Sequence, residues 1–248
     1  MISSRTFTAT LIVVIAISYS GYAHAAGSAY AVDTSDVNPP GWCKFDIWYS
    51  RASNRDLTAV GNPDCVVDIG RPVEFNAQLS RSRSDGDWTT SVAPKAKTNI
   101  IPSAIGSLGL GVSASATYDL INRETTSISV NVPATLPFSK EFRINVNGGW
   151  SWDRTVDRQY LTYGVGVDWR TPNNVHMLTV EIFGQVGPSQ DVSTVTQPRF
   201  QAGLRWRPID EFSVDVIYGR NISGENANWI TFAVTFRTPS SGGGPGVE

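Results

Sequence analysis

Apolar and polar residues alternate along most of this chain, in segments of about ten residues that are separated by turn-forming residues. Strands with one apolar face and one polar face give this pattern, whereas signals for helices are weak. The pattern predicts about twelve strands, near Trp42–Tyr49, Leu57–Ile69, Pro72–Ser80, Asp87–Asn99, Ile105–Leu120, Thr125–Leu136, Lys140–Trp152, Gln159–Arg170, Val175–Val186, Thr196–Arg207, Glu211–Asn221 and Asn228–Arg237. The chain is therefore expected to be an all-β protein.

The segment Phe200–Arg220, FQAGLRWRPIDEFSVDVIYGR, indicates what the apolar faces contact. If Pro208–Asp210 forms the hairpin loop, Trp206 is expected opposite Phe212, and small aliphatic residues follow along both strands. Aromatic residues at the ends of an apolar face are typical of strands in lipid, where they form girdles at the two interfaces. The aromatic residues predicted at the membrane interfaces are Tyr163, Trp169, Phe200, Trp206, Phe212 and Tyr218.

Alternation alone would also fit a soluble β-sandwich, in which two sheets press their apolar faces together. The apolar faces of this chain have small residues in the middle, whereas a dry core favours large interlocking side chains. Compact turns, such as residues 70–71, alternate with longer polar connections, such as Ser82–Gly86, as they do at the two rims of outer-membrane barrels. We therefore predict a closed, antiparallel, up-and-down transmembrane β-barrel of about twelve strands.

The two ends of the chain differ from the predicted barrel. Arg5, the apolar run Leu11–Ile17 and the motif Ala23-His24-Ala25 predict a secretory signal peptide over residues 1–25, in preference to a retained anchor. Residues 26–41 are expected to form an N-terminal lead-in to a barrel of residues 42–237. Residues 238–248 are rich in Gly, Ser and Pro, which predicts a disordered tail.

Cys43 and Cys65 both follow the predicted signal peptide. In an oxidising compartment they are expected to form a disulfide that contributes on the order of 3 kcal/mol, and two free thiols are the alternative. No metal site is expected, because further ligands nearby are not evident. The 22 acidic and 20 basic residues nearly balance and form no basic run, so nucleic acid is not an expected partner.

Charged residues of both signs lie on the polar face of the predicted strands. The candidates for the wall of the lumen are Glu74, Lys95, Lys97, Arg143, Asp168, Arg170, Glu181, Arg205 and Asp215. Arg205 is expected to lie diagonal to Asp215 across one hairpin. Such a lining either selects polar and charged solutes or closes the lumen with ion pairs and hydrogen bonds.

Signals for an enzyme are weak. A hydrolase would have to use His176 together with an acid such as Asp168, and a residue at the membrane interface is the favoured interpretation of this histidine. The glycine-rich runs GSLGLG and GVGV lie within predicted strands, so we expect no phosphate-bearing cofactor there. Glycine at these places is expected to ease strand curvature or to avoid crowding in the lumen. We expect neither catalysis nor a cofactor.

Several strand-and-turn patterns carry a resemblance to a known family: CKFDIWYS, PVEFNAQLSRS, PKAKTNI, NVNGGWSWDR, YGVGVDWR, LTVEIFGQ and PRFQAGLRWRPIDEFSVDVIYGR. From about Val32 to Arg237 the chain resembles transporter-like bacterial outer-membrane β-barrels that are related to the outer-membrane family of the phenol-degradation meta-pathway. The resemblance implies an outer-membrane barrel and a transport role, and it implies no particular substrate.

The last predicted strand ends near Phe236, which is similar to the carboxy-terminal recognition signal of bacterial outer-membrane proteins, although a tail follows it here. The expected partners are therefore outer-membrane lipid, the barrel-assembly machinery and a small-molecule solute. The expected function is a passive pore or uptake channel with a polar, charged lumen. A closed-lumen barrel that acts through outer loops such as Gly187–Val195 is one alternative, and an outer-membrane hydrolase is another.

Overall fold

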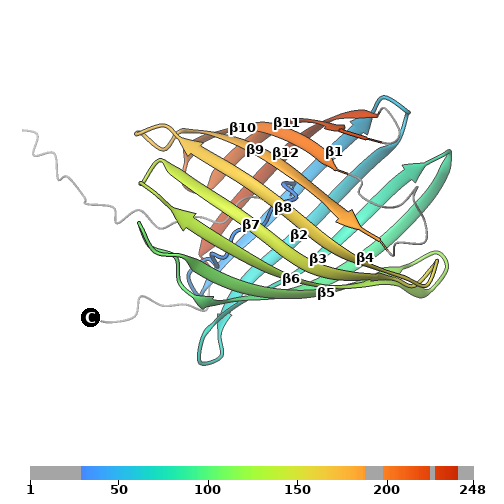
Figure 1. Cartoon of the computed structure of the whole chain (residues 1–248), viewed down its shortest axis with the longest axis horizontal. Helices are drawn as coiled ribbons and strands as arrows, with labels where there is room; N and C mark the ends of the chain where they lie inside the picture. Colours follow the sequence, from blue (N-terminus) through green and yellow to red (C-terminus); the bar gives the residue numbers. More distant parts are fainter. Residues whose placement is uncertain (1–28, 188–197, 224–226, 240–248) are drawn as a thin grey trace, which may run out of the picture.

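The computed structural model describes residues 29–187, 198–223 and 227–239, which form one closed β-barrel (Figure 1). Its strands are β1 (Trp42–Ala52), β2 (Leu57–Asp68), β3 (Pro72–Ser84), β4 (Asp87–Ile101), β5 (Gly109–Asp119), β6 (Glu124–Pro137), β7 (Phe142–Asp153), β8 (Arg158–Arg170), β9 (His176–Val186), β10 (Arg199–Ile209), β11 (Phe212–Asn221) and β12 (Asn228–Pro239). They follow one another around the barrel in chain order, and neighbouring strands pair antiparallel. The all-β, twelve-stranded, closed antiparallel barrel predicted from the sequence is confirmed.

The barrel closes where β1 pairs with β12, from Trp42 opposite Pro239 to Ala52 opposite Trp229. Closure satisfies the backbone of every strand and leaves no sheet edge, as hydrocarbon surroundings require. β12 continues past the expected barrel end at Arg237. The predicted signal peptide, the predicted outer loop after Gly187 and the tail from residue 240 lie outside the described residues.

One strand begins later than predicted. The alternation suggested a strand from Ile105, but β5 starts at Gly109 and residues 102–108 form a turn. Pro102 has no N–H to donate to a sheet, and Gly106 has a φ of 77°, which an extended strand does not allow. The apolar residues of this segment are therefore exposed at a rim instead of continuing the strand.

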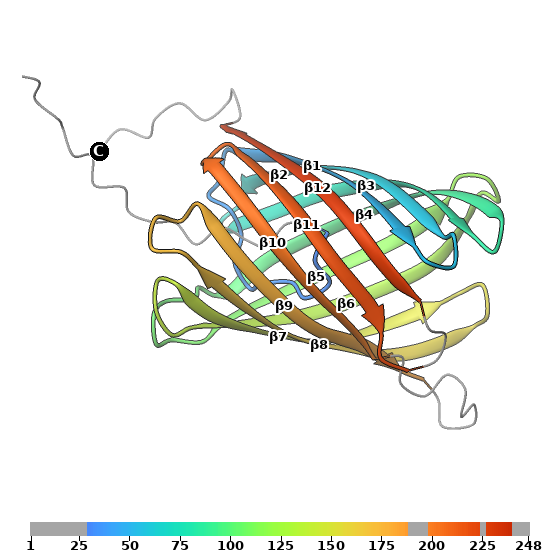
Figure 2. The ribbon, with the colours of Figure 1, turned by 90° about the horizontal axis from the view of Figure 1, so that it is seen from above.

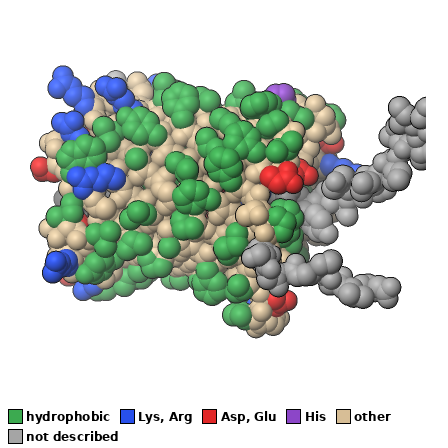
Figure 3. Space-filling view, turned by 180° about the vertical axis from the view of Figure 1, so that it is seen from behind, with side chains coloured by type: hydrophobic (Ala, Val, Ile, Leu, Met, Phe, Trp, Pro, Cys, Tyr) green, Lys and Arg blue, Asp and Glu red, His purple; other side chains and the backbone are tan. Residues whose placement is uncertain are grey.

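Side chains are distributed inside out compared with a soluble protein. Leu161 and Phe232 are 65% and 57% exposed on the outer surface, whereas Arg205 and Asp168 are each 1% exposed inside. Hydrophobic side chains cover much of the outer surface in Figure 3, over the height of the barrel. Within the described ranges, no helix has the length and apolar character needed to cross a membrane.

The β10–β11 hairpin keeps the predicted faces but not the predicted pairing. Trp206 lies opposite Val214 and not opposite Phe212, which pairs with Ile209. The register shifts between Trp206 and Ile209 because Pro208 cannot donate to the ladder and a bulge forms there. Since a shift by two residues preserves the side-chain parity, the outer face stays apolar.

Candidate functional site

The sequence-predicted lumen residues all lie on strands whose polar faces point into the barrel. Glu74, Lys97, Arg143, Asp168, Glu181, Arg205 and Asp215 are buried there, and Lys95 and Arg170 are half-buried. They do not converge on one point but form separate pairs around the wall. Lys44, which the sequence analysis did not single out, lies 3.0 Å from Asp64 and 3.8 Å from Glu74.

Arg205 and Asp215 are direct neighbours across the β10–β11 hairpin, not diagonal ones as expected. The Arg205 Nε donates to Asp215 Oδ1 at 2.8 Å, and both side chains are about fully buried. The bulge at Pro208 produces this direct pairing, because it shifts the two strands past each other.

The main feature that sequence reasoning missed is a segment inside the barrel. Residues 29–41, here called the N-terminal plug, were expected to be a lead-in, but they run within the lumen before β1 begins at a rim (Figures 1 and 2). Val32, Thr34 and Ser35 are 1%, 0% and 0% exposed. Side chains of the wall bind the plug along its length, so it belongs to the packed interior.

Tyr30 and the backbone after it bind one side of the wall. The Tyr30 hydroxyl donates to Asp215 Oδ1 at 3.1 Å. The carboxylate of Glu181 accepts two backbone bonds, from the N–H of Ala31 at 3.0 Å and from the N–H of Val32 at 3.3 Å. A buried carboxylate of the wall thus satisfies plug donors that would otherwise have no partner.

Asp33 is the charged contact in the middle of the plug. Lys95 Nζ and Lys97 Nζ each donate to its carboxylate at 2.7 Å. Asn147 clamps the backbone, because its Oδ1 accepts from the Asp33 N–H and its Nδ2 donates to the Asp33 carbonyl. Asp33 belongs to no membrane-spanning strand; burial raises its pKa, but the two ammonium groups outweigh burial and hold the pKa well below its ordinary value.

The rim-side part of the plug is held as well. Arg143 bridges the plug to the wall, since its Nη1 lies 3.2 Å from Asp36 Oδ2 and its Nε lies 2.6 Å from Asp168 Oδ2. The Ser35 N–H donates to Thr135 Oγ1 at 2.8 Å. Charge-assisted bonds therefore fix both the middle and the rim-side part of the plug.

Lumen-facing glycines make room for the plug. A Cβ on Gly164 would lie 2.9 Å from Val32 Cγ2, and one on Gly203 would lie 2.5 Å from the Tyr30 hydroxyl oxygen. The expectation that GVGV avoids crowding in the lumen fits this position of Gly164. Glycine in these strands is the one sequence feature that the plug explains, and it does not by itself predict a plug.

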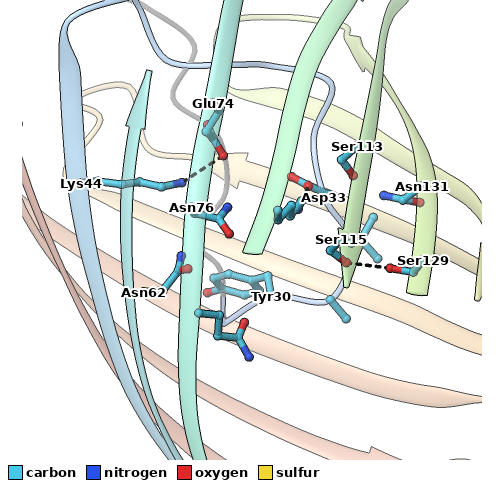
Figure 4. A pocket seen from close by; sticks show the side chains of 14 residues that line it. Tyr30, Asp33, Lys44, Asn62, Glu74, Asn76, Ser113, Ser115, Ser129 and Asn131 are labelled. Atoms are coloured by element: carbon cyan, nitrogen blue, oxygen red, sulfur yellow. Dashed lines mark hydrogen bonds and ion pairs between the residues drawn. The ribbon is translucent and has the colours of Figure 1, made fainter. Parts of the chain in front are cut away.

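Among the described residues, two cavities lie beside the plug. One, of about 190 Å³, is lined by Tyr30 and Asp33 and by polar side chains of β1 to β6 (Figure 4). The other, of about 330 Å³, extends from Ala31 along Thr162 and Gln185 to Arg199. Gln185 and Arg199 lie at the end of the barrel with the predicted outer loops, so among the described residues this cavity lies on that side of the plug.

The disulfide between Cys43 and Cys65 is confirmed and joins β1 to β2 where the plug meets the barrel. It excludes the alternative of two free thiols. Gly41, at the end of the plug, donates its N–H to Val66 O at 2.9 Å. The root of the plug is therefore tied to the wall.

The predicted interface aromatics lie on the outer face. Trp169, Trp206 and Tyr218 are 50%, 48% and 44% exposed. The other predicted positions, which are partly exposed, are Tyr163, Phe200 and Phe212. Phe212 contacts Phe236 with ring centroids 5.4 Å apart.

The hydrolase alternative lacks an assembled site. His176 is exposed at the start of β9 and lies opposite the outward-facing Trp206. Asp168, its proposed acid, points inward and accepts bonds from Arg143, Asn145 and Thr179. The two side chains face opposite sides of the barrel wall.

A family model described as "Uncharacterised conserved protein UCP029691" matches residues 13–238 of the chain. The search of curated proteins finds no match. Among solved structures, the COG4313 outer membrane channel from Pseudomonas putida F1 is 12% identical, with a TM-score of 0.60, over 82% of this chain and 98% of that one.

Two porins are similar in fold to the same degree. The KdgM porin in complex with disordered oligogalacturonate is 8% identical, with a TM-score of 0.59, over 78% of this chain and 98% of that one. The NanC porin is 8% identical, with a TM-score of 0.60, over 77% of this chain and 98% of that one. These similarities show that the barrel has the fold of outer-membrane channels.

Proposed function

The chain belongs to the uncharacterised conserved family whose model it matches, and we propose that it acts in the bacterial outer membrane as a passive pore for small polar solutes, with its N-terminal plug as the constriction. The observation that carries this proposal is a closed barrel with exposed apolar side chains outside, buried charged side chains inside and a cavity of about 330 Å³ beside the plug. Diffusion through such a lumen requires no catalytic group, and wall charges set which solutes pass.

The described barrel supports a filtering role more than a wide pore. Twelve strands lie between the filled eight-stranded barrels and the open porins of about 16–18 strands. The plug occupies part of this limited space, and the cavities beside it hold solutes no larger than small molecules. Solutes would enter through the hollow side and pass the plug, either beside it or after it moves.

Three further parts of the proposal come from the sequence or from related folds. The similar structures are outer-membrane channels and porins, which supports a membrane location and contact with outer-membrane lipid. The amphipathic terminal strand β12, which contains Phe236 and ends at Pro239, supports insertion by the barrel-assembly machinery. The strand-and-turn patterns support a relationship to the outer-membrane family of the phenol-degradation meta-pathway.

Conductance in planar bilayers tests the pore. The purified mature protein is expected to give small or flickering current steps, and a variant that lacks residues 29–38 is expected to give larger and steadier steps, because the constriction is removed. Absence of current from both proteins at any voltage would remove the pore function.

The plug also favours a second candidate, a barrel with a closed lumen that acts through its outer loops. The specific observation is that ion pairs and hydrogen bonds bind the plug to β4, β6, β7, β9 and β11. Current from the plug-deleted variant together with none from the intact protein would favour this candidate over the passive pore.

A further inference from the structure

Two buried arginines near one rim of the lumen have no hydrogen-bond partner at several of their donors. Arg207 on β10 is 4% exposed and Arg237 on β12 is 5% exposed. In each of them, Nε and Nη1 are buried without a hydrogen bond. A buried charged donor without a hydrogen-bond partner is more unfavourable than a buried neutral donor without one. We therefore expect that a bound group supplies the partner for these donors.

Ser213 adds a third unpartnered group between the two arginines. It lies on β11, between the strands that carry Arg207 and Arg237, and its side chain is 0% exposed with no partner for its hydroxyl. The pairing registers place the three residues at a similar height in the barrel. Ser213 lies opposite Thr235, which is two residues before Arg237 on the same inward face of β12. Ser213 also faces the bulge of β10 that contains Arg207. Three adjacent strands thus present donors to one stretch of the inner wall.

The two arginines lie on the inner wall at the same rim of the barrel, and both are buried. The charge of Arg237 acts on Arg207, as do those of Arg205 and Arg170. The two residues lie at the same rim, because each is bonded to a turn there. The Arg207 N–H donates to Val175 O, just before β9, and the Arg237 N–H donates to Glu211 O, between β10 and β11, each at 2.7 Å. Two guanidinium groups with unpartnered donors therefore lie at this end of the lumen.

Three carboxylates lie near the two arginines, and none of them bonds the unpartnered donors. Asp215 accepts from Arg205 and from the plug residue Tyr30. Asp46, which also acts on the charge of Arg237, accepts from Thr235 at 2.6 Å. Asp210, in the turn between β10 and β11, acts on the charge of both arginines, but Nε and Nη1 of each arginine still have no hydrogen-bond partner.

We propose that Arg207, Ser213 and Arg237 form a binding site for an oxyanion, namely the carboxylate or phosphate group of a small solute. Guanidinium groups bind such groups through paired, charge-assisted N–H bonds, and the serine hydroxyl supplies one more donor. The role of the site in selecting anionic solutes rests on the proposed pore function, whereas binding itself does not. The substrate class that follows is small organic anions.

Binding is measured without current, on the detergent-purified barrel, as a shift of its unfolding temperature. Inorganic phosphate and acetate serve as probes, each compared with chloride at matched ionic strength. A ligand of the folded barrel raises this temperature, and about 1 kcal/mol of binding corresponds to roughly 2–4 °C for a protein of this size. We expect such a rise with at least one probe, and the one that acts identifies whether phosphate or carboxylate fits the site.

Three variants assign the shift to the site. The double variant R207Q/R237Q is expected to lose the anion-dependent rise, and Ser213→Ala is expected to reduce it. Arg71→Gln removes one positive charge from an exposed turn at the same rim and is expected to keep the rise. In chloride, R207Q/R237Q is expected to unfold at a temperature close to that of the natural protein, because it removes buried charged donors that have no hydrogen-bond partner.

Either of two results would overturn the proposal: no rise with phosphate or acetate in the natural protein, or an equal rise in R207Q/R237Q. If the double variant does not fold, Ser213→Ala decides, since an unchanged rise in that variant excludes the site. Failure of the pore function, in contrast, would appear as absence of current and would leave the anion-dependent shift in place.

Discussion

At the scale of single residues, the interior of this barrel depends on charge pairing. The Asp33 carboxylate forms salt bridges with the ammonium groups of Lys95 and Lys97 at 2.7 Å, and Arg205 forms one with Asp215 at 2.8 Å. A buried charge that loses its partner becomes unfavourable, so such pairs fix one arrangement of the interior even where their net stabilisation is small. Asp33 is the residue through which this argument is tested, because it connects the plug to β4.

Asp33→Asn is expected to loosen the plug while the barrel stays closed. The change removes the charge that Lys95 and Lys97 share and weakens plug binding by about 2 kcal/mol, or more than tenfold in the population of undocked plug. The rate at which a maleimide labels a cysteine placed at Ser35, which is fully buried, measures this population.

The control for this prediction is Asp87→Asn, which removes the same charge from an exposed position of β4. It is expected to leave the labelling rate at Ser35 unchanged. Equal rates in the natural protein and the Asp33→Asn variant would show that Asp33 does not hold the plug.

At the scale of elements, the plug and the strands are adjusted to each other. Polar bonds, close fit and buried apolar side chains together keep the plug in place, since Tyr30 packs against Ile217 and Val32 is 1% exposed. Gly164 on β8 approaches Val32, and its added Cβ would meet other atoms only at 3.5 Å or more. A side chain at this position therefore acts on the plug and spares the barrel wall.

Gly164→Val is expected to displace the plug and to increase the single-channel conductance of the intact chain. The reason is steric: a Cβ would lie 2.9 Å from Val32 Cγ2, and the plug is the part that can move away. Planar bilayer recordings measure the change. Gly148→Val is the matched control on β7, because a Cβ there meets nothing within 4 Å.

An unchanged conductance in Gly164→Val would mean that the plug does not set the current. A change in both glycine variants would instead point to a general effect of valine on the strands, and the plug would lose its assigned role.

At the scale of the whole molecule, apolar side chains lie outside and charged side chains inside, and this distribution decides whether the protein is stable in water or in a membrane. Exposed Leu, Ile, Val and aromatic residues cover the wall from β1 to β12, and charged groups fill the inside. In water such a surface would associate, and in hydrocarbon it is satisfied. The soluble β-sandwich considered from the sequence is excluded, because the strands form one closed barrel and not two stacked sheets.

The protein is expected to require detergent or lipid and to show heat-modifiable migration. The closed barrel, with all strands paired to neighbours, resists detergent until it is heated, so boiled and unboiled samples should migrate differently on electrophoresis of membrane fractions. Recovery from the periplasm without detergent, in a form that migrates identically before and after boiling, would contradict the membrane barrel.

Much of the barrel was predictable because strand alternation is a local property. Each strand has its own two faces, so the strand number and the two sets of residues could be inferred from alternation without knowledge of the contacts. The closed fold required a further signal, namely the aromatic residues at the ends of the apolar faces and the alternation of short and long connections. Local signals were weaker for the boundaries. The turn before Gly109 and the bulge at Pro208 depend on backbone details, and the predictions of a strand from Ile105 and of Trp206 opposite Phe212 were wrong there.

The sequence by itself determined which side chains face lipid and which face the lumen, because parity along a strand survives errors of register. Only the tertiary structure decided what fills the lumen. The plug is bound by Glu181, Asn147 and Lys97, which are far from it in sequence, and no short pattern links them. The same holds for Arg207 and Arg237: consecutive hairpins bring β10, β11 and β12 side by side, but only the packing of the interior leaves donors of the two arginines without partners.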